Sequence, residues 1–573
     1  MLKKLLKIFS QNKSHSALIL IGTAVWSLTM IKSGLVYSYG MGFWGPNGHD
    51  GIWHIALAGG LARGTMQMPI FAGEVIKNYH IGFDLFLAAV HKLSLIPIHI
   101  LYFQILPPVF AILVGIFCHK FVYLWTKNKT KTFWAVFFLY FGGGLGWFVN
   151  LLKGQEIAGE SMFWSQQSVS TLINPPYAFS LVLIFAGLFY FHKGLEQKNK
   201  NDLILATFIF GVLIQIKVYA GILMLVGLML AGIWNVWKMK GLAVLKVFVG
   251  SLILSILLFT PSAGKVSRVL VFKPFWFLET MMIFPDRLGW EKFGEAMVNY
   301  KLGGTWLKAI IAYGLALFIF IIGNFGSRVI GIFWFWRKGK VLRSYQYVEV
   351  LMIAVIFTGI ILPLFIVQKG TAWNTIQFMY YSLLFIGVLA GVYFGGITMK
   401  LKSMMVRIFI LLTILLTVPT TPGVLFYHYL PSRPPAMISK KEMEALDFLS
   451  NQNGGIVLTQ PFDKKKADAA IVFPPRPLYL YESTAYVSAF SEKTTYLEDQ
   501  MNLEITGYDW QSRRRKVENF FSNGNLSDNS VFLKNNKIEF LYILKDFKEG
   551  NLEENQFLSK IYENSEVEIY RVN

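Results

Sequence analysis

The sequence predicts an α-helical multi-pass membrane protein with about eleven transmembrane helices, followed by a C-terminal extracytoplasmic α/β domain. Of the 573 residues, 54% are hydrophobic and only 15% are charged, whereas soluble domains carry about 25% charged residues. Apolar runs of about 18 residues or more recur along the chain, and each is long enough to cross a bilayer.

Charge divides the chain near residue 430. The first 430 residues carry 36 Lys and Arg against 12 Asp and Glu, whereas the remainder carries 18 against 21. Lysine-rich cytoplasmic loops explain such a basic balance in a membrane protein. The predicted partner is therefore the lipid bilayer and not a nucleic acid. We expect a transmembrane domain over 1–430 and a soluble extracytoplasmic domain over 431–573.

The first span is predicted at about 16–38. Lys3, Lys4, Lys7 and Lys13 precede it, and no small-residue cleavage site follows it, so we expect an uncleaved span with a cytoplasmic N-terminus. The single cysteine, Cys118, lies in a later span, which leaves no partner for a disulfide within the chain and no cysteine-based metal site.

Lysine-rich segments separate the later apolar runs. The apolar stretch 203–236 is interrupted only by Gln215 and Lys217, and its length suits two short spans that meet at the outer face at Lys217. The other spans are expected at about 100–125, 132–151, 175–193, 247–260, 306–335, 347–367, 378–397 and 408–425.

The first outer loop, residues 39–99, is too rich in Gly, Pro and polar residues for a clean span. Two surface helices are expected there, at about 51–63 and 80–95. After a linker at 431–435, the pattern predicts a helix over 442–449 and strands over 455–459, 538–543 and 567–571, which is typical of a small α/β domain.

Asp50 is the first acidic residue of the chain and lies in this loop, within Trp44-Gly-Pro-Asn-Gly-His-Asp50-Gly-Ile-Trp-His54. An exposed carboxylate at the membrane face suits a general base, although an Asp ahead of a helix is also a good N-cap. His54 follows four residues later on the same helical face. It is a candidate for orienting Asp50, binding a phosphate or ligating a metal, while simple packing is an equal alternative.

Lys217 is the second candidate, because a lysine within an apolar stretch needs either the interface or an anion. Snorkelling to the interface and binding a lipid phosphate explain it equally well. Tyr79 and His80 open the second surface helix, where His80 can donate to a phosphate or the pair can belong to an aromatic belt.

Three further residues are candidates for substrate binding. Glu160 and its neighbour Glu156 suit a second acid or a metal ligand, although a solvated loop is the simpler interpretation. Asn374 and Gln377, in a short outer loop, are expected to line a polar cavity. No cofactor is required by these residues, and the use of a divalent metal stays open.

This layout resembles the GT-C class of integral-membrane glycosyltransferases, in particular the protein O-mannosyltransferase-like and aminoarabinose-transferase-like families. The resemblance implies polyprenyl-phosphate-linked sugar donors, Asp50 as the catalytic base and Lys217 as a contact of the lipid phosphate. The Gly-Pro that follows this lysine in the family is replaced by Lys217-Val-Tyr-Ala-Gly221, and Asn78-Tyr-His80 replaces a Pro-Pro-aromatic element. The chain is therefore expected to be a divergent member.

The expected function is transfer of a sugar from a polyprenyl-phosphate donor to an acceptor lipid, glycan or protein at the outer face of the plasma membrane. The alternatives are a transporter or lipid flippase, which often shows internal repeats that are not evident here, and a non-catalytic cell-envelope assembly protein.

Overall fold

The computed structural model describes all residues except 1–11, 263–269, 340–343, 523–525 and 548–556. It contains two compact units. The first unit is built from the described residues of 1–29, 107–261 and 265–430, and the second from those of 30–106 and 431–573. Lys3, Lys4 and Lys7, on which the predicted cytoplasmic N-terminus rests, lie outside the described residues.

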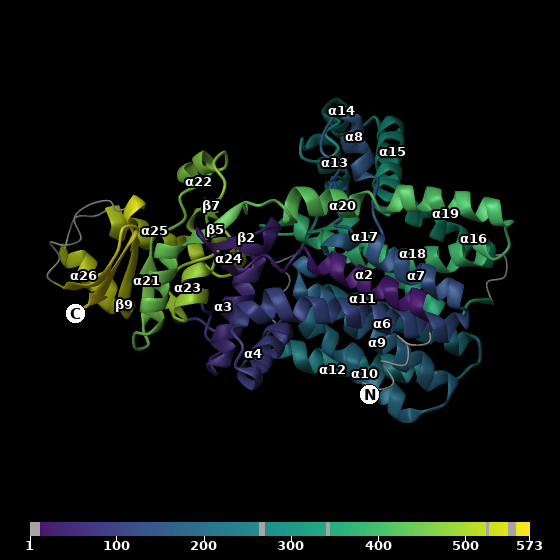
Figure 1. Ribbon diagram of the computed structural model, residues 1–573, viewed down its shortest axis with the longest axis horizontal. Helices are drawn as coiled ribbons and strands as arrows, with labels where there is room; N and C mark the ends of the chain where they lie inside the picture. The colour runs from purple at the N-terminus through teal and green to yellow at the C-terminus, as the bar shows by residue number, and fades with distance from the viewer. Residues whose placement is uncertain (1–11, 263–269, 340–343, 523–525, 548–556) are drawn as a thin grey trace. The chain divides into compact units, whose positions relative to one another are not determined.

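The first unit is a bundle of helices, many of which run alongside one another in Figure 1. Its only described strands, β3 (Leu270–Phe272) and β4 (Ile366–Gln368), form a short antiparallel pair. The helices are α2 (Lys13–Ser27), α6 (Leu106–Thr126), α7 (Lys129–Phe141), α8 (Gly146–Leu152), α9 (Pro175–Glu196), α10 (Lys200–Ile216), α11 (Val218–Trp237), α12 (Ala243–Phe259), α13 (Trp276–Ile283), α14 (Glu291–Leu302), α15 (Trp306–Phe325), α16 (Ile330–Gly339), α17 (Tyr347–Phe365), α18 (Gln377–Thr398), α19 (Ser403–Thr417) and α20 (Thr420–Val424).

Within the described residues, seven helical stretches are long and apolar enough to cross a bilayer. They are Ile98–Thr126, Pro175–Glu196, Val218–Trp237, Trp306–Trp336, Tyr347–Phe365, Ala372–Thr398 and Ser403–Tyr429. The pair α7 and α8, bent by 52°, makes an eighth if it is counted as one span. The protein is thus a multi-pass α-helical membrane protein.

Seven or eight helices rather than about eleven therefore meet the length criterion. The other three predicted spans fall on helices that are shorter than the roughly 20 residues of a full span. These are α2, with 15 residues, and α10 and α12, with 17 residues each. The predicted break at Lys217 is confirmed, because α10 ends at Ile216, α11 begins at Val218, and Lys217 between them has an extended backbone.

Helices α7 and α18 approach closely along glycines of α18. A Cβ at Gly391 would lie 2.4 Å from the backbone of Ala135, and one at Gly395 would lie 2.8 Å from the Cα of Lys131. These glycines are four residues apart and so share one helical face. Small residues at such spacing let helix backbones meet in a membrane, where van der Waals packing drives association.

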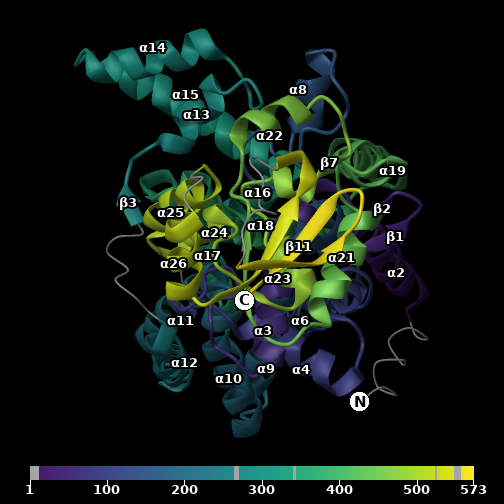
Figure 2. The ribbon, with the colours of Figure 1, turned by 90° about the vertical axis from the view of Figure 1, so that its left-hand side faces the viewer.

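The second unit contains a five-stranded mixed sheet in the order β10-β11-β9-β6-β8. The predicted helix and strands are confirmed as α21 (Lys440–Ser450), β6 (Ile456–Thr459), β9 (Ile538–Leu544) and β11 (Val567–Val572). Strand β6 is parallel to both β9 and β8 (Thr494–Thr495), whereas β10 (Leu558–Glu563) and β11 are antiparallel. Helix α21 lies beside β11, as Figure 2 shows.

Several shorter elements complete this unit. Helices are present at both positions predicted in this loop, as α3 (Asp50–Ala62), most of whose residues are buried, and α4 (Gly82–Ser94). Helix α3 packs against α23. The remaining helices are α5 (Ile98–Ile100), α22 (Lys464–Ala470), α23 (Tyr486–Ser491), α24 (Gln500–Thr506), α25 (Trp510–Ser522) and α26 (Leu526–Asn535).

A second sheet, β1-β2-β5-β7, joins the first outer loop to the C-terminal segment. Strand β2 (Gly40–Phe43) lies between β1 (Leu35–Tyr37) and β5 (Ala436–Ser439), antiparallel to both, and β7 (Arg476–Pro477) extends the sheet from β5. Residues after the expected linker are therefore paired with the loop that carries Asp50. Further backbone hydrogen bonds run from Ala72 to Thr495 and from Thr495 to Pro69.

Gly40 tests the importance of this pairing. Its φ of +136° disfavours other residues, and a Cβ would lie 2.1 Å from the carbonyl oxygen of Ile438. We expect Gly40→Ala to lower the free energy of unfolding by about 1–3 kcal/mol, measured by thermal unfolding of the purified protein. Gly454→Ala is the control, because a Cβ at Gly454 meets no atom within 4 Å. Equal stability of the two variants would contradict the prediction.

Candidate functional site

Asp50 is the first residue of α3 and follows a 3-10 turn over Gly45–Gly48. The residue in the N-cap position is His49, and no side chain makes a capping hydrogen bond to this helix. The interpretation of Asp50 as an N-cap is therefore wrong. Its side chain is exposed at the end of a helix, where the backbone N–H groups favour a negative charge.

His49 joins the start of α3 to the C-terminal segment. Its Nδ1 lies 2.5 Å from Ser483 Oγ, and its ring stands edge-on to Tyr481 at 4.4 Å between centroids. Burial lowers the pKa of His49 to about 4, with Asp50 opposing and Arg476 reinforcing the effect. The imidazole is thus neutral at pH 7 and orients the loop without adding a charge beside Asp50.

Asp499 is the carboxylate that the sequence analysis missed. It is the N-cap of α24, it is buried, and it accepts hydrogen bonds from the backbone N–H and the side-chain amide of Asn502 at 3.1 and 2.7 Å. The pKa of Asp499 is raised to about 7, mainly by burial and also by the charges of Asp50 and Glu482, while the hydrogen bonds from Asn502 oppose the rise. Asp50 and Asp499 therefore lie within electrostatic range of each other.

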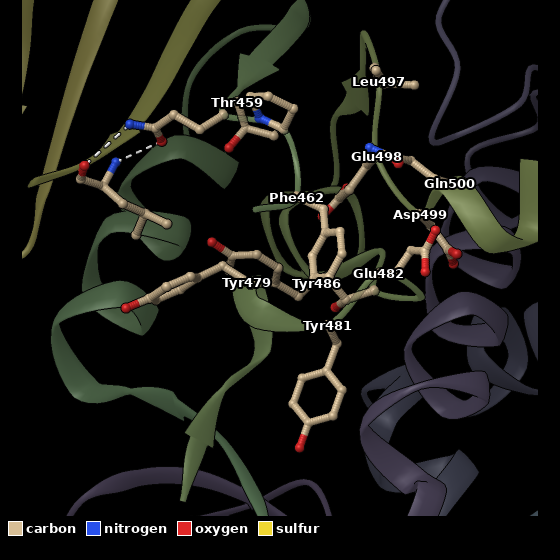
Figure 3. A pocket seen from close by; sticks show the side chains of 14 residues that line it. Thr459, Phe462, Tyr479, Tyr481, Glu482, Tyr486, Leu497, Glu498, Asp499 and Gln500 are labelled. Carbon is tan, nitrogen blue, oxygen red and sulfur yellow. Dashed lines mark hydrogen bonds between the residues drawn. The ribbon is translucent and has the colours of Figure 1, made fainter. Parts of the chain in front are cut away.

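Asp499 lines a small pocket of about 40 Å³ that is formed by residues of the C-terminal segment. Figure 3 shows Glu482, Asp499 and Gln500 on one side of it, toward the purple helices of the first outer loop. Glu498 also lines the pocket and accepts the backbone N–H groups of Val487 and Ser488. Burial raises the pKa of Glu498 to about 8, so protonated carboxyl groups occur here at neutral pH.

His54 points to a different partner. Its Nδ1 lies 2.7 Å from Asp84 Oδ1, and both side chains are buried. The pair joins α3 to α4. No hydrogen bond between His54 and Asp50 occurs among the described residues. The geometry fits a residue that positions the two surface helices, and it leaves the predicted catalytic role of His54 as a proposal.

Tyr79 and His80 pack beside this pair. Their rings stack at 4.6 Å, and Tyr79 contacts Trp53 edge-on at 5.5 Å. Burial raises the pKa of Tyr79, followed by the charge of Asp84 and then by Asp50 and Asp499. Tyr79 thus lies within electrostatic range of all three aspartates, and the loop residues of the candidate site gather in one unit.

Lys217 belongs to the first unit, where it is buried at the break between α10 and α11. Its Nζ donates to Asn174 Oδ1 at 3.3 Å and lies 5.8 Å from the ring centroid of Tyr219. Asn174 is also the N-cap of α9. The lysine is held inside the protein among polar and aromatic groups, rather than extended along its surface.

Asn374 and Gln377 form a chain of amides at the start of α18. The Asn374 amide donates to Gln368 Oε1 at 2.8 Å, and Gln377 donates to Asn374. Phe378 of this helix contacts Tyr219 at 4.8 Å. The amides and Lys217 therefore lie near the same end of α18.

Glu160 is half-buried, and Ser170 Oγ lies 2.7 Å from both of its carboxylate oxygens. Burial raises the pKa of Glu160 to about 7. The solvated-loop interpretation is therefore wrong for Glu160 and fits only the exposed Glu156. In the part of the chain that the structure describes, no group of three or more His, Cys, Asp or Glu side chains is arranged to hold a metal ion.

The fold is GT-C-like, as the sequence resemblance implies. Among solved structures, the chain is similar to the arabinofuranosyltransferase AftD from mycobacteria, with a TM-score of 0.51 and 9% sequence identity. The likeness covers 98% of this chain and 40% of that one. At this level of identity it concerns the fold alone.

Two further solved structures are less similar. The oligosaccharyltransferase of Archaeoglobus fulgidus, with a tethered acceptor peptide, matches at a TM-score of 0.49 and 11% identity, over 93% of this chain and 69% of that one. ArnT from Cupriavidus metallidurans, bound to undecaprenyl phosphate, matches at 0.33 and 11% identity, over 97% of each chain. No family model and no curated protein sequence matches this chain.

The buried His54–Asp84 pair provides a test of its structural role. Removing Asp84 leaves the buried His54 without this hydrogen bond, so we expect Asp84→Ala to lower the free energy of unfolding by about 1–3 kcal/mol. Glu74→Ala is the control, because Glu74 and Lys77 form an exposed pair at 3.3 Å whose loss costs less than about 1 kcal/mol. Similar thermal unfolding of both variants would contradict this role.

Asp499 predicts a pH dependence of stability. Its pKa is about 7 in the folded protein against a usual value of 3.8. Between these values the unfolded chain has released the proton and the folded chain keeps it, so the free energy of unfolding falls as pH rises. We expect Asp499→Asn to reduce that fall between about pH 4 and 7 by roughly 2–4 kcal/mol.

The measurement is thermal or denaturant unfolding across this pH range. Asp509→Asn is the matched control, because Asp509 is an exposed aspartate of the same segment. A profile for Asp499→Asn that superimposes on the control would contradict the assignment.

Proposed function

We propose that this protein is a glycosyltransferase that moves a sugar from a polyprenyl-phosphate donor to an acceptor at the outer face of the plasma membrane. The observation that carries the proposal is the exposed carboxylate of Asp50 at the first residue of α3, within electrostatic range of the buried Asp499. The fold shared with AftD, an arabinofuranosyltransferase, supports sugar transfer over transport or a non-catalytic assembly role.

In the proposed reaction, Asp50 acts as the general base. It accepts the proton of the acceptor hydroxyl while the hydroxyl oxygen attacks the anomeric carbon. The bond between this carbon and the phosphate oxygen breaks, and the lipid phosphate leaves with the bonding electrons. Attack opposite the leaving group inverts the anomeric centre. General base catalysis of this kind contributes about 10²–10⁴-fold to a rate.

The two buried carboxyl groups that line the pocket, Glu498 and Asp499, differ from Asp50 in their exposure to solvent. Near pH 7 much of the Asp499 and Glu498 population is protonated, because burial raises the pKa of each to about 7 and about 8. Asp50 is then the exposed carboxylate that meets the acceptor. In many enzymes, different environments give neighbouring carboxyl groups different pKa values, so that one acts as the acid and the other as the base.

Lys217 is proposed to bind the donor phosphate. His80, in the other unit, is proposed separately as a residue that can donate a hydrogen bond to a phosphate. Burying a charged lysine costs free energy, and a bound anion reduces that cost through charge-assisted hydrogen bonds. Asn374 and Gln377 are proposed to bind the sugar hydroxyls through their amides, and Tyr79 and Glu160 are proposed to shape the substrate sites. Mechanistically, His54 positions the helix that presents Asp50.

The orientation is proposed from the lysine-rich loops: N-terminus in the cytoplasm and residues 431–573 outside. The acceptor is a lipid, glycan or protein that presents a hydroxyl group at the outer face. Composition and net charge change near residue 430. In the folded protein, however, residues 30–106 belong to the same compact unit as residues 431–573.

Asp50→Asn tests the base directly. With a radiolabelled polyprenyl-phosphate sugar as donor, we expect the variant to transfer sugar about 10²–10⁴-fold more slowly than the wild type, because the amide cannot accept the proton. Donor binding should be retained, since the substitution conserves size.

Asp286→Asn is the control, because Asp286 is an exposed aspartate predicted on the same membrane face. Transfer by Asp50→Asn within a few-fold of this control would show that Asp50 is not the base. A wild-type protein that neither binds nor uses any polyprenyl-phosphate sugar would contradict the proposed function as a whole.

A further inference from the structure

A cavity of about 500 Å³ lies in the helical unit, and none of the residues proposed for catalysis lines it. It is formed where α6, α7, α16, α17 and α18 meet, and α16 and α18 lie next to each other in Figure 1. The residues that define its chemistry are Lys131, Lys338, Lys400, Glu349, Trp125 and Trp334.

The position of the cavity follows from α18. This helix begins at Gln377, next to the amides of the candidate site, and Gly396 near its other end lines the cavity. At 1.5 Å per residue, the two points are about 30 Å apart, which is the thickness of a bilayer core. The cavity therefore lies at the opposite membrane face from Asn374 and Gln377, on the side that the lysine-rich loops predict to be cytoplasmic.

The charge of the cavity wall is positive. Three lysines and one glutamate line it, which leaves a formal charge of +2. Glu349 is buried and accepts hydrogen bonds from Lys338 and from the backbone N–H of Gln346, so its charge is matched by Lys338. Lys131 and Lys400 are the other two lysines of the wall.

Close packing of helices directs Lys131 into this wall. Gly395 of α18 lets the backbone of α7 approach, with the Cα of Lys131 2.8 Å from where a Cβ would be. The Cε of Lys131 lies 3.6 Å from where a Cβ on Gly396 would be. The aliphatic part of the lysine therefore crosses α18 at a glycine, where no side chain is in the way. The lysine is thereby held along α18 toward the cavity.

Aromatic rings form the rest of the wall. Trp125 and Trp334 lie 6.3 Å apart and are largely buried, and the Lys338 ammonium lies 5.3 Å from the Trp334 ring centroid. Tryptophan next to lysine at the ends of apolar helices is typical of the level of the lipid headgroups. A ligand in this cavity thus meets cations and aromatic surface at the depth of the membrane interface.

We infer that this cavity binds the headgroup of an anionic phospholipid from the cytoplasmic leaflet. Lysines between transmembrane helices on that side carry the charge opposite to that of the lipid phosphate. They bind the phosphate oxygens by charge-assisted hydrogen bonds. The tryptophan rings contact the glycerol and upper acyl region. A lipid held there bridges α7, α16 and α18, and so stabilises the helical unit at the end of α18 opposite to Gln377.

Phosphatidylglycerol binding to the purified full-length protein in neutral detergent, followed by native mass spectrometry, tests this site. We expect Lys131→Gln with Lys400→Gln to weaken the binding roughly thirtyfold, since each basic residue contributes about fivefold at an anionic surface. Lys131→Arg with Lys400→Arg keeps the charge and should restore binding. The matched control is Lys200→Gln with Lys246→Gln, two exposed lysines outside the cavity on the same predicted face.

Three outcomes would overturn the proposal. One is equal affinity in the Gln variant and the control. Another is equal binding of phosphatidylcholine, which would make the charge irrelevant. The third is displacement of the lipid by equimolar inorganic phosphate, which would assign the cavity to a soluble anion. If the Gln variant does not elute as a folded protein, the comparison of wild type with the Arg variant and with phosphatidylcholine still decides the case.

Discussion

The candidate site depends on the antiparallel pairing of β2 with β5. Backbone hydrogen bonds between Gly40–Phe43 and Ala436–Ser439 join the first outer loop to a segment at the other end of the chain. The hydrogen bond between His49 and Ser483 spans 434 residues of sequence. Closing such a loop costs conformational entropy, although the cost grows only slowly with length. Many backbone contacts between the two segments offset it, and Gly40 permits the closest of them.

This pairing places two aspartates in different environments within one unit. Asp50 is exposed at the first residue of a helix, whereas Asp499 is buried at the start of another. Burial holds the proton on Asp499 up to about pH 7, and the neighbouring negative charges act in the same direction. A base and a protonated acid can therefore coexist although both are aspartates, which is a requirement for proton transfer near neutral pH.

In the helical unit, distant segments are joined by close contact between helix backbones. In the other unit they are joined by hydrogen bonds between strands. Gly391 and Gly395 let α7 and α18 meet, because no hydrophobic effect drives helices together within lipid. The same contact carries Lys131 into the basic cavity, while the opposite end of α18 carries Gln377. One helix thus connects the proposed substrate face with the proposed lipid site.

The sequence by itself determined the membrane class, the α/β character of the C-terminal segment, the presence of two helices between residues 50 and 95, and the break at Lys217. Each depends on local composition or periodicity, which is independent of the rest of the chain. Lys217 was recognisable because a lysine within an apolar stretch needs either the interface or an anion, and Asp50 because it is the first acidic residue and follows the first apolar run. Only the tertiary structure decided that His54 pairs with Asp84, that Asp499 joins Asp50, and that three distant lysines share a cavity. These depend on burial and on contacts between segments far apart in the chain, and no local pattern records them.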